Sequence, residues 1–296
     1  MSFNHALSFA LVVTAVAAPD RALAYCFTST CKGLNVCFEE EDPECVRTRW
    51  KSNCVGFAVN DQTVDGISAE DLKEVTARAF LRWRSADCGD GAPPGLFAEY
   101  MGAIACDAAE YNRDAGNANL IVMTKAPDDD DISGHTFALT TTSFDPDTGE
   151  LLGADIELNL RDHTFTIGDE GVLVDLESVL SHEVGHFLGI AHSDDVDATM
   201  FPFYQEGTTE IRSLSADDET AICILYPPDR DVDASCNPLP RHGFSPECRN
   251  DQTEGGCNAT SRRTDRLWVL LPLGALLIAA RRRHRTASRG KDRPAA

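Results

Sequence analysis

Three histidines and one glutamate are spaced so that they can hold and use a metal ion. They lie in the stretch HEVGHFLGIAH, at residues 182–192. Residues four apart on a helix share one face, so His182 and His186 can point at the same ion. Glu183 then lies one step round the helix, where its carboxylate can reach a water on that ion. Gly189 accepts the left-handed conformation that ends a helix, and the reversal can bring back His192 as a third ligand.

This set of residues predicts a catalytic zinc site. Three protein ligands leave the fourth tetrahedral position of zinc open, as catalysis requires. The alternative is three unrelated histidines on a buried helix. At average composition the full pattern should arise by chance on the order of once in 10⁵ chains of this length. The short form HExxH is only moderately specific, whereas the extended form is strong.

The stretch is the metzincin signature, and the residues after it resemble a matrixin, the family of matrix metalloproteinase-like zinc endopeptidases. Residues 198–204 (ATMFPFY) resemble the methionine turn and the pocket wall of that family. Residues 214–218 and 225–226 resemble the start and end of its C-terminal helix. The resemblance covers residues 45–228. It implies an α+β fold with a mixed twisted sheet and two long helices, in which the active-site helix precedes the methionine turn and C-terminal helix.

The resemblance also implies roles for individual residues. Met200 would form an apolar floor beneath the zinc, and Asp218 would support the methionine turn from behind. The substrate pocket would be lined by Pro202, Phe203 and Tyr204, with Ser178 at its inner end. Astacins and serralysins have tyrosine where this chain has Pro202, which favours matrixins. The implied activity is hydrolysis of protein or peptide substrates by a zinc-bound water that Glu183 activates.

Further metal ions were considered. Matrixins often carry a second, structural zinc, but His135 and His163 do not reproduce the family's histidine pattern, so we expect one catalytic Zn²⁺. Asp145, Asp147, Asp155 and the run at residues 128–131 could bind Ca²⁺ through hard oxygen ligands, and a solvated acidic loop is the alternative. No cysteine-switch motif is visible, so latency through a cysteine on the zinc is not expected.

Apolar periodicity predicts the elements that position these residues. Helices are expected at residues 69–85, 174–188 and 216–225, and strands at residues 55–59, 120–123, 137–142 and 154–158. Ser68 and Ser215 have the character of helix N-caps. The sequence 145–149 (DPDTG) predicts a turn between the last two strands.

Composition points to an exported, acidic protein. Residues 1–24 read as a signal peptide, with an apolar run and the small residues Ala22 and Ala24 before the cut; a buried N-terminal helix is the alternative. All 11 cysteines follow that cut, which predicts disulfide bonds, with one cysteine left over. Residues 25–44 form a cysteine-rich lead-in. The formal net charge of −22 argues against a nucleic-acid partner.

Beyond the peptidase domain, residues 229–265 are expected to form a linker with cysteine staples at most. Residues 266–296 hold a short apolar stretch and then the basic cluster RRRHR. With Cys257, predicted to be the unpaired cysteine, they resemble the MYXO-CTERM sorting tail. That resemblance implies transient membrane anchoring, contact with a sorting protease, and display at the cell surface, in the outer envelope or outside the cell. A C-terminal core helix is the alternative.

Two functional classes compete on sequence alone. The first is a secreted or surface-displayed zinc metalloendopeptidase, and the second is a surface-displayed, non-catalytic binding protein stabilised by zinc. Glu183 favours the enzyme, because a structural zinc site has no need of a general base. Within the enzyme class, a different metzincin family with a narrower peptide substrate remains a further alternative.

Overall fold

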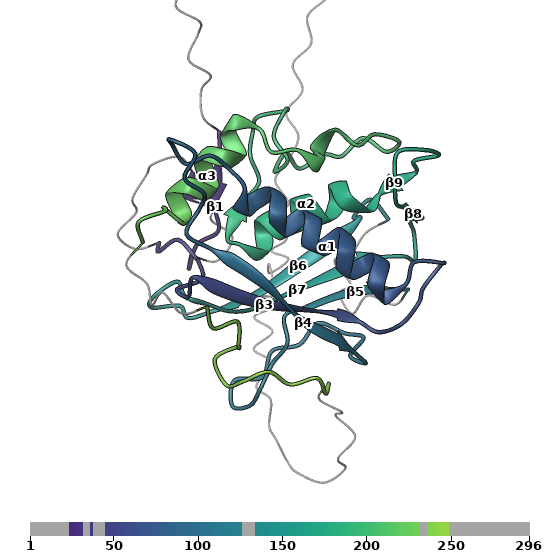
Figure 1. Ribbon diagram of the computed structural model, residues 1–296, viewed down its shortest axis with the longest axis horizontal. Coiled ribbons are helices and arrows are strands. Elements are labelled where there is room, and N and C mark those ends of the chain that lie inside the picture. Colours follow the sequence, from purple (N-terminus) through teal and green to yellow (C-terminus); the bar gives the residue numbers. More distant parts are fainter. Residues whose placement is uncertain (1–23, 32–35, 38–44, 126–133, 231–235, 249–296) are drawn as a thin grey trace, which may run out of the picture. The chain divides into compact units, whose positions relative to one another are not determined.

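The strands predicted from the sequence pair in one five-stranded sheet, with the order β4-β3-β5-β7-β6 (Figure 1). The computed structural model describes residues 24–31, 36–37, 45–125, 134–230 and 236–248. The sheet consists of β3 (Cys54–Asn60), β4 (Phe97–Ile104), β5 (Leu120–Thr124), β6 (Ala138–Phe144) and β7 (Leu151–Asn159). Four strands run parallel, and β6 pairs antiparallel to β7 at the edge. The sheet is therefore mixed, as predicted.

Three α-helices accompany the sheet. They are α1 (Ala69–Arg84), α2 (Leu176–Phe187) and α3 (Ala216–Leu225), and η1 (Glu210–Arg212) is a short 3₁₀ helix. The remaining strands are the short pieces β1 (Cys26–Phe27), β2 (Val36–Cys37), β8 (Phe165–Thr166), β9 (Val174–Asp175) and β10 (Ile190–Ala191). Ser68 and Ser215 cap α1 and α3, each in a reciprocal capping box with an aspartate three residues later. Both N-cap predictions are confirmed.

Helix α2 begins two residues later than its periodicity predicts. Val174 and Asp175 are extended and pair with β8. Asp175 is the N-cap, and its side chain accepts a hydrogen bond from the backbone N–H of Ser178. The capping carboxylate satisfies a donor that the first helical turn leaves free.

The sheet has a buried layer on each face. Alternate residues such as Phe57, Val59 and Ile121 belong to the main core with the helices. Their neighbours, including Ala58, Leu120 and Val122, form a smaller cluster on the other face. Side chains alternate between faces along a strand, so these central strands contribute to both layers. In Figure 1, α1 and α2 lie side by side over the first face.

The second face is covered by a segment expected to be linker. Phe244 and Cys248 pack on the smaller cluster, and Asn117 forms a β-bridge to Phe244. Cys236 and Cys248 are joined by disulfides to Cys54 and Cys106. The packed body thus continues past the predicted boundary at residue 228 to residue 248. The cysteine staples were foreseen, but the packing was not, because this segment has no periodic apolar pattern.

Ten cysteines form five disulfides. The pairs are Cys26–Cys37, Cys31–Cys45, Cys54–Cys236, Cys88–Cys223 and Cys106–Cys248. Disulfide formation is confirmed, and Cys257 is the eleventh cysteine; it lies outside the described residues. Residues 1–23 of the predicted signal peptide and the predicted apolar–basic tail lie there too. Within the ranges given above, no helix has the length and apolar character needed to cross a membrane.

Stability should fall between weakly acidic and weakly basic pH because of Asp155. Burial raises the pKa of this carboxyl to about 8, although the backbone N–H of Leu120 donates to it at 2.7 Å. The native state keeps a proton that the unfolded chain releases near pH 4. This contribution is complete below about pH 4 and is lost as pH rises through about 8, at up to about 1.4 kcal/mol per pH unit.

Urea unfolding at pH 5 and pH 8.5 would measure that loss. Asp155→Asn should reduce the difference in unfolding free energy between the two pH values. Asp145→Asn is a suitable control, because Asp145 is a partly exposed residue whose pKa is lowered mainly by the backbone N–H of Asp147. If Asp155→Asn retains the full wild-type difference, the protonated state of Asp155 is wrong.

Candidate metal centre and substrate cleft

The three histidines of the signature meet at one point. Each of the three residues His182, His186 and His192 contributes one ring nitrogen, and these three nitrogens all lie within 4.8 Å of one another. The Nε2 atoms of His186 and His192 are 3.2 Å apart. Two zinc–nitrogen bonds of about 2.0–2.1 Å at a tetrahedral angle require a separation of roughly 3.3 Å. This separation and the three clustered nitrogens therefore fit a zinc ion, which His182, His186 and His192 would hold.

The other ring nitrogens of the two helical histidines are held by backbone carbonyls. His182 Nδ1 lies 2.7 Å from the carbonyl oxygen of Thr199, and His186 Nδ1 lies 2.8 Å from that of Ile190. A protonated Nδ1 donating to these carbonyls leaves Nε2 free to bind metal. Burial lowers the pKa of both imidazoles to about 4, so they are neutral ligands at neutral pH.

The turn at Gly189 brings His192 to the other two, as predicted. Gly189 has φ of +94°, and a side-chain Cβ at this position would collide with the carbonyl oxygen of Thr48. Strand β10 follows the turn and pairs antiparallel with β1 of the lead-in. The Thr28 backbone N–H and hydroxyl both donate to the Gly189 carbonyl at 3.0 Å. The disulfide-linked lead-in therefore supports the strand that precedes the third histidine.

Met200 is buried against helix α2 in a tightly packed turn. Its side chain is 1% exposed and is so close to Gly185 of α2 that a Cβ there would collide with its sulfur. The carboxylate of Asp218 accepts hydrogen bonds from the backbone N–H groups of Thr199 (2.7 Å) and Met200 (3.1 Å). Helix α3 therefore supports the turn at Met200 through Asp218. That Met200 forms an apolar floor beneath a zinc ion stays a prediction.

Glu183 lies beside the histidines and has one partner that sequence reasoning missed. The Thr140 hydroxyl donates to Glu183 Oε2 at 2.6 Å and lies 3.2 Å from the Glu183 carbonyl oxygen. Burial raises the pKa of Glu183, whereas His186 and Thr140 lower it. Thr140 belongs to the edge strand β6, and no motif in the sequence marks it.

A cleft of about 750 Å³ runs between α2, β6 and the loop after the methionine turn. Its lining includes the three histidines, Glu183, Thr28, Phe137, Leu139, Val179, Pro202, Phe203, Tyr204, Glu206 and Ile211. The predicted wall residues are therefore in place. Ser178 is not among the lining residues and is completely buried. Successive helical residues point about 100° apart, so Val179 faces the cleft in its stead.

The residues considered for further metal ions do not gather with one another. Asp155 is buried and accepts from Leu120 N–H, whereas Asp145 caps its own turn by accepting from the N–H groups of Asp147 and Thr148. The run at residues 128–131 lies outside the described residues. His135 lines the cleft, and His163 packs against Phe137 with ring centroids 4.4 Å apart. Among the described residues, only one histidine cluster suited to a metal is found.

The α+β architecture, in which a mixed sheet is followed by the histidine-bearing helix α2, the turn at Met200 and the C-terminal helix α3, resembles that of a metzincin catalytic domain. Residues 111–227 match the family model described as matrixin, of the M10 peptidases. The match and the architecture together support a matrixin-like metzincin domain.

The sequence is also similar to proteins that are named as metalloendoproteinases or collagenases. Metalloendoproteinase 1-MMP of Arabidopsis thaliana is 30% identical over 185 residues, which are 62% of this chain and 45% of that protein. Interstitial collagenase A of Mus musculus is 37% identical over 128 residues, 43% of this chain and 25% of that protein. This chain spans less than half the length of both relatives. The similarity to these metalloendoproteinases therefore concerns only part of each relative.

Proposed function

We propose that this protein is a zinc metalloendopeptidase in which His182, His186 and His192 hold the metal and Glu183 is the general base. The observation that carries the proposal is the convergence of three histidine nitrogens within 4.8 Å, in a cleft that Glu183 also lines. The similarity to metalloendoproteinases supports it. A non-catalytic zinc-stabilised binding protein would need neither the open position nor the buried carboxylate.

The chemistry divides between the metal and the chain. Zinc, when bound, would lower the pKa of water and polarise the peptide carbonyl. Glu183 would take a proton as the water attacks and then deliver it to the leaving amine. Thr140 holds one carboxylate oxygen of Glu183, so the base is oriented before substrate arrives. Strand β6 is the edge of the sheet and lines the cleft, so an extended substrate could pair with it.

The direct test is to incubate a denatured substrate protein with the purified protein, with and without a chelator, and to measure cleavage. We expect cleavage that the chelator abolishes and that added zinc restores. Cleavage unaffected by the chelator would argue against a metallopeptidase. Stoichiometric zinc without any cleavage would favour the binding protein.

We expect a preference for an apolar residue directly after the scissile bond. The cleft that holds the histidines is also lined by the apolar or aromatic side chains of Phe137, Leu139, Val179, Tyr204 and Ile211. Burying a leucine-sized side chain there gains about 1.5–3 kcal/mol, whereas a charged side chain would be desolvated without a partner. A peptide library cleaved and sequenced by mass spectrometry measures the preference. A profile dominated by charged residues at this position would refute it.

We also propose that the protein is exported and that residues 266–296 are a sorting or anchoring tail. Two features support this proposal: the signal-like N-terminus, and the short apolar stretch near the C-terminus that is followed by an arginine cluster. The test is expression in the native host of the full chain and of a chain truncated after Thr253. We expect the truncated form to lose its cell association. Equal association of both forms, with an intact C-terminus on the mature full-length protein, would refute the proposal.

A further inference from the structure

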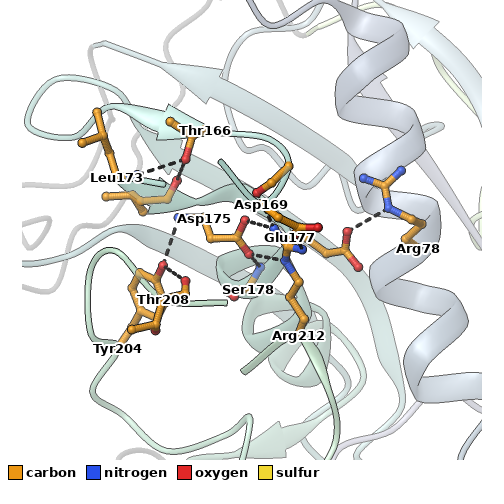
Figure 2. A network of polar contacts seen from close by, with 12 residues as sticks. Arg78, Thr166, Asp169, Leu173, Asp175, Glu177, Ser178, Tyr204, Thr208 and Arg212 are labelled. Atoms are coloured by element: carbon orange, nitrogen blue, oxygen red, sulfur yellow. Dashed lines mark hydrogen bonds and ion pairs between the residues drawn. The ribbon is translucent and has the colours of Figure 1, made fainter. Parts of the chain in front are cut away.

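One arginine ties the cleft wall to the start of the active-site helix. The wall loop is defined here as residues 201–213, which follow the methionine turn. Ile211 of this loop lines the cleft. Its neighbour Arg212 is not among the lining residues and instead contacts Asp175, the N-cap of α2 (Figure 2). Adjacent residues of η1 therefore serve the substrate cleft on one side and the active-site helix on the other.

The contact between Arg212 and Asp175 is bidentate and enclosed. Arg212 Nε donates to Asp175 Oδ2 at 2.7 Å, and Nη2 donates to Oδ1 at 2.5 Å. The side chain of Asp175 is 0% exposed and that of Arg212 is 17% exposed. A planar guanidinium matches both oxygens of a carboxylate, which fixes orientation as well as distance. An ammonium group in the same place would act as a point charge and fix distance alone.

Tyr204 makes a second tie from the same loop to the same residue. Its hydroxyl accepts from the Asp175 backbone N–H at 3.0 Å and donates to the Thr208 carbonyl at 2.7 Å. Its ring packs edge-on against Phe137, with centroids 5.5 Å apart. Tyr204 and Phe137 both line the cleft. Asp175 is thus linked to the pocket wall in two ways, through Tyr204 and through Arg212.

We propose that Arg212 is a specificity-determining positioning residue, which holds the wall loop on Asp175 and thereby fixes the width of the apolar pocket between the loop and Val179. This inference rests on the proposed peptidase function. A pocket discriminates between apolar side chains of different size only if its wall does not follow the smaller one inward. Loops are otherwise the mobile part of a fold, so a rigid wall needs an anchor of this kind.

The test compares three single variants with the wild type. Arg212→Lys keeps the charge and loses the bidentate geometry. Asp175→Asn keeps an N-cap acceptor and loses the charge. Asp169→Asn is the matched control, because Asp169 is the outer partner of Arg212, at 2.7 Å, and is 83% exposed. Three properties are measured for each protein. They are the zinc content, the hydrogen–deuterium exchange of residues 201–213, and the kcat and KM for two peptides. The peptides differ only in having leucine or alanine after the scissile bond.

We expect one zinc per chain in every variant. In Arg212→Lys and Asp175→Asn, exchange in the wall loop should rise, and the leucine-to-alanine ratio of kcat/KM should fall at least about 5-fold, mainly through a higher KM for leucine. Asp169→Asn should stay within about 2-fold of the wild type. Unchanged exchange would overturn the tie, and unchanged selectivity would overturn its role in specificity. If the wild type cleaves neither peptide, the proposed function fails, and exchange alone decides whether Arg212 holds the loop.

Discussion

Replacing Glu183 by alanine is expected to leave about one zinc per chain and to lower peptide hydrolysis by at least 10²-fold. Glu183 is not one of the three clustered histidines proposed to hold the metal, but it lines the same cleft and its carboxylate is oriented by Thr140. Loss of a positioned general base typically costs 10²–10⁴-fold in rate. Zinc content by elemental analysis and kcat/KM on one peptide measure the two parts separately.

Glu177→Gln provides a control on the same helix. Glu177 is paired with Arg78 of α1 at 2.8 Å and does not line the cleft (Figure 2). Its loss should leave zinc content unchanged and reduce activity by less than about 2-fold, since a partly exposed ion pair contributes little. A Glu183→Ala protein that keeps more than about 1% of wild-type turnover would remove Glu183 from the mechanism.

His192→Ala is expected to lose both metal and activity. A site with two remaining histidines, His182 and His186, would hold zinc far more weakly than the three-ligand site. Zinc affinity measured by competition with a chromogenic chelator gives the direct result. His242→Ala is the control, because the His242 side chain is exposed and is not one of the clustered histidines, so this variant should bind zinc as the wild type does.

Unchanged zinc affinity in His192→Ala would mean that another residue is the third ligand. Glu206 would then be the first alternative, because it lines the same cleft, and Glu210 in η1 would be the second. The distance between the Nε2 atoms of His186 and His192 argues for the histidine. The variant therefore tests the geometry of the turn at Gly189 as much as the ligand itself.

The parts of this structure that could be predicted depend on local information. Capping boxes at Ser68 and Ser215 involve residues three apart, and the histidines of α2 are four apart. The reversal at Gly189 needs one residue without a Cβ. In each case the residues involved are a few positions apart in the sequence and are also neighbours in the structure. The pattern can therefore be recognised before the fold is known.

The parts that were missed depend on pairs far apart in the chain. Arg212 and Asp175 are 37 residues apart, and Thr140 and Glu183 are 43 apart. Strand β4 escaped prediction because its burial does not alternate cleanly, as its edge position in the sheet explains. Disulfide partners are set by the fold in the same way, since every cysteine is chemically equivalent in the sequence.

The long-range disulfides determine what happens to this chain when a peptide bond in it is cleaved. Cys54–Cys236, Cys88–Cys223 and Cys106–Cys248 close loops that overlap over residues 106–223, and this region contains α2 and the whole wall loop. A single nick anywhere in that overlap leaves both fragments covalently joined by three bridges. Such a molecule would migrate as one chain on a gel until it is reduced. Self-cleavage in the wall loop could therefore alter selectivity while the protein still runs as an intact band.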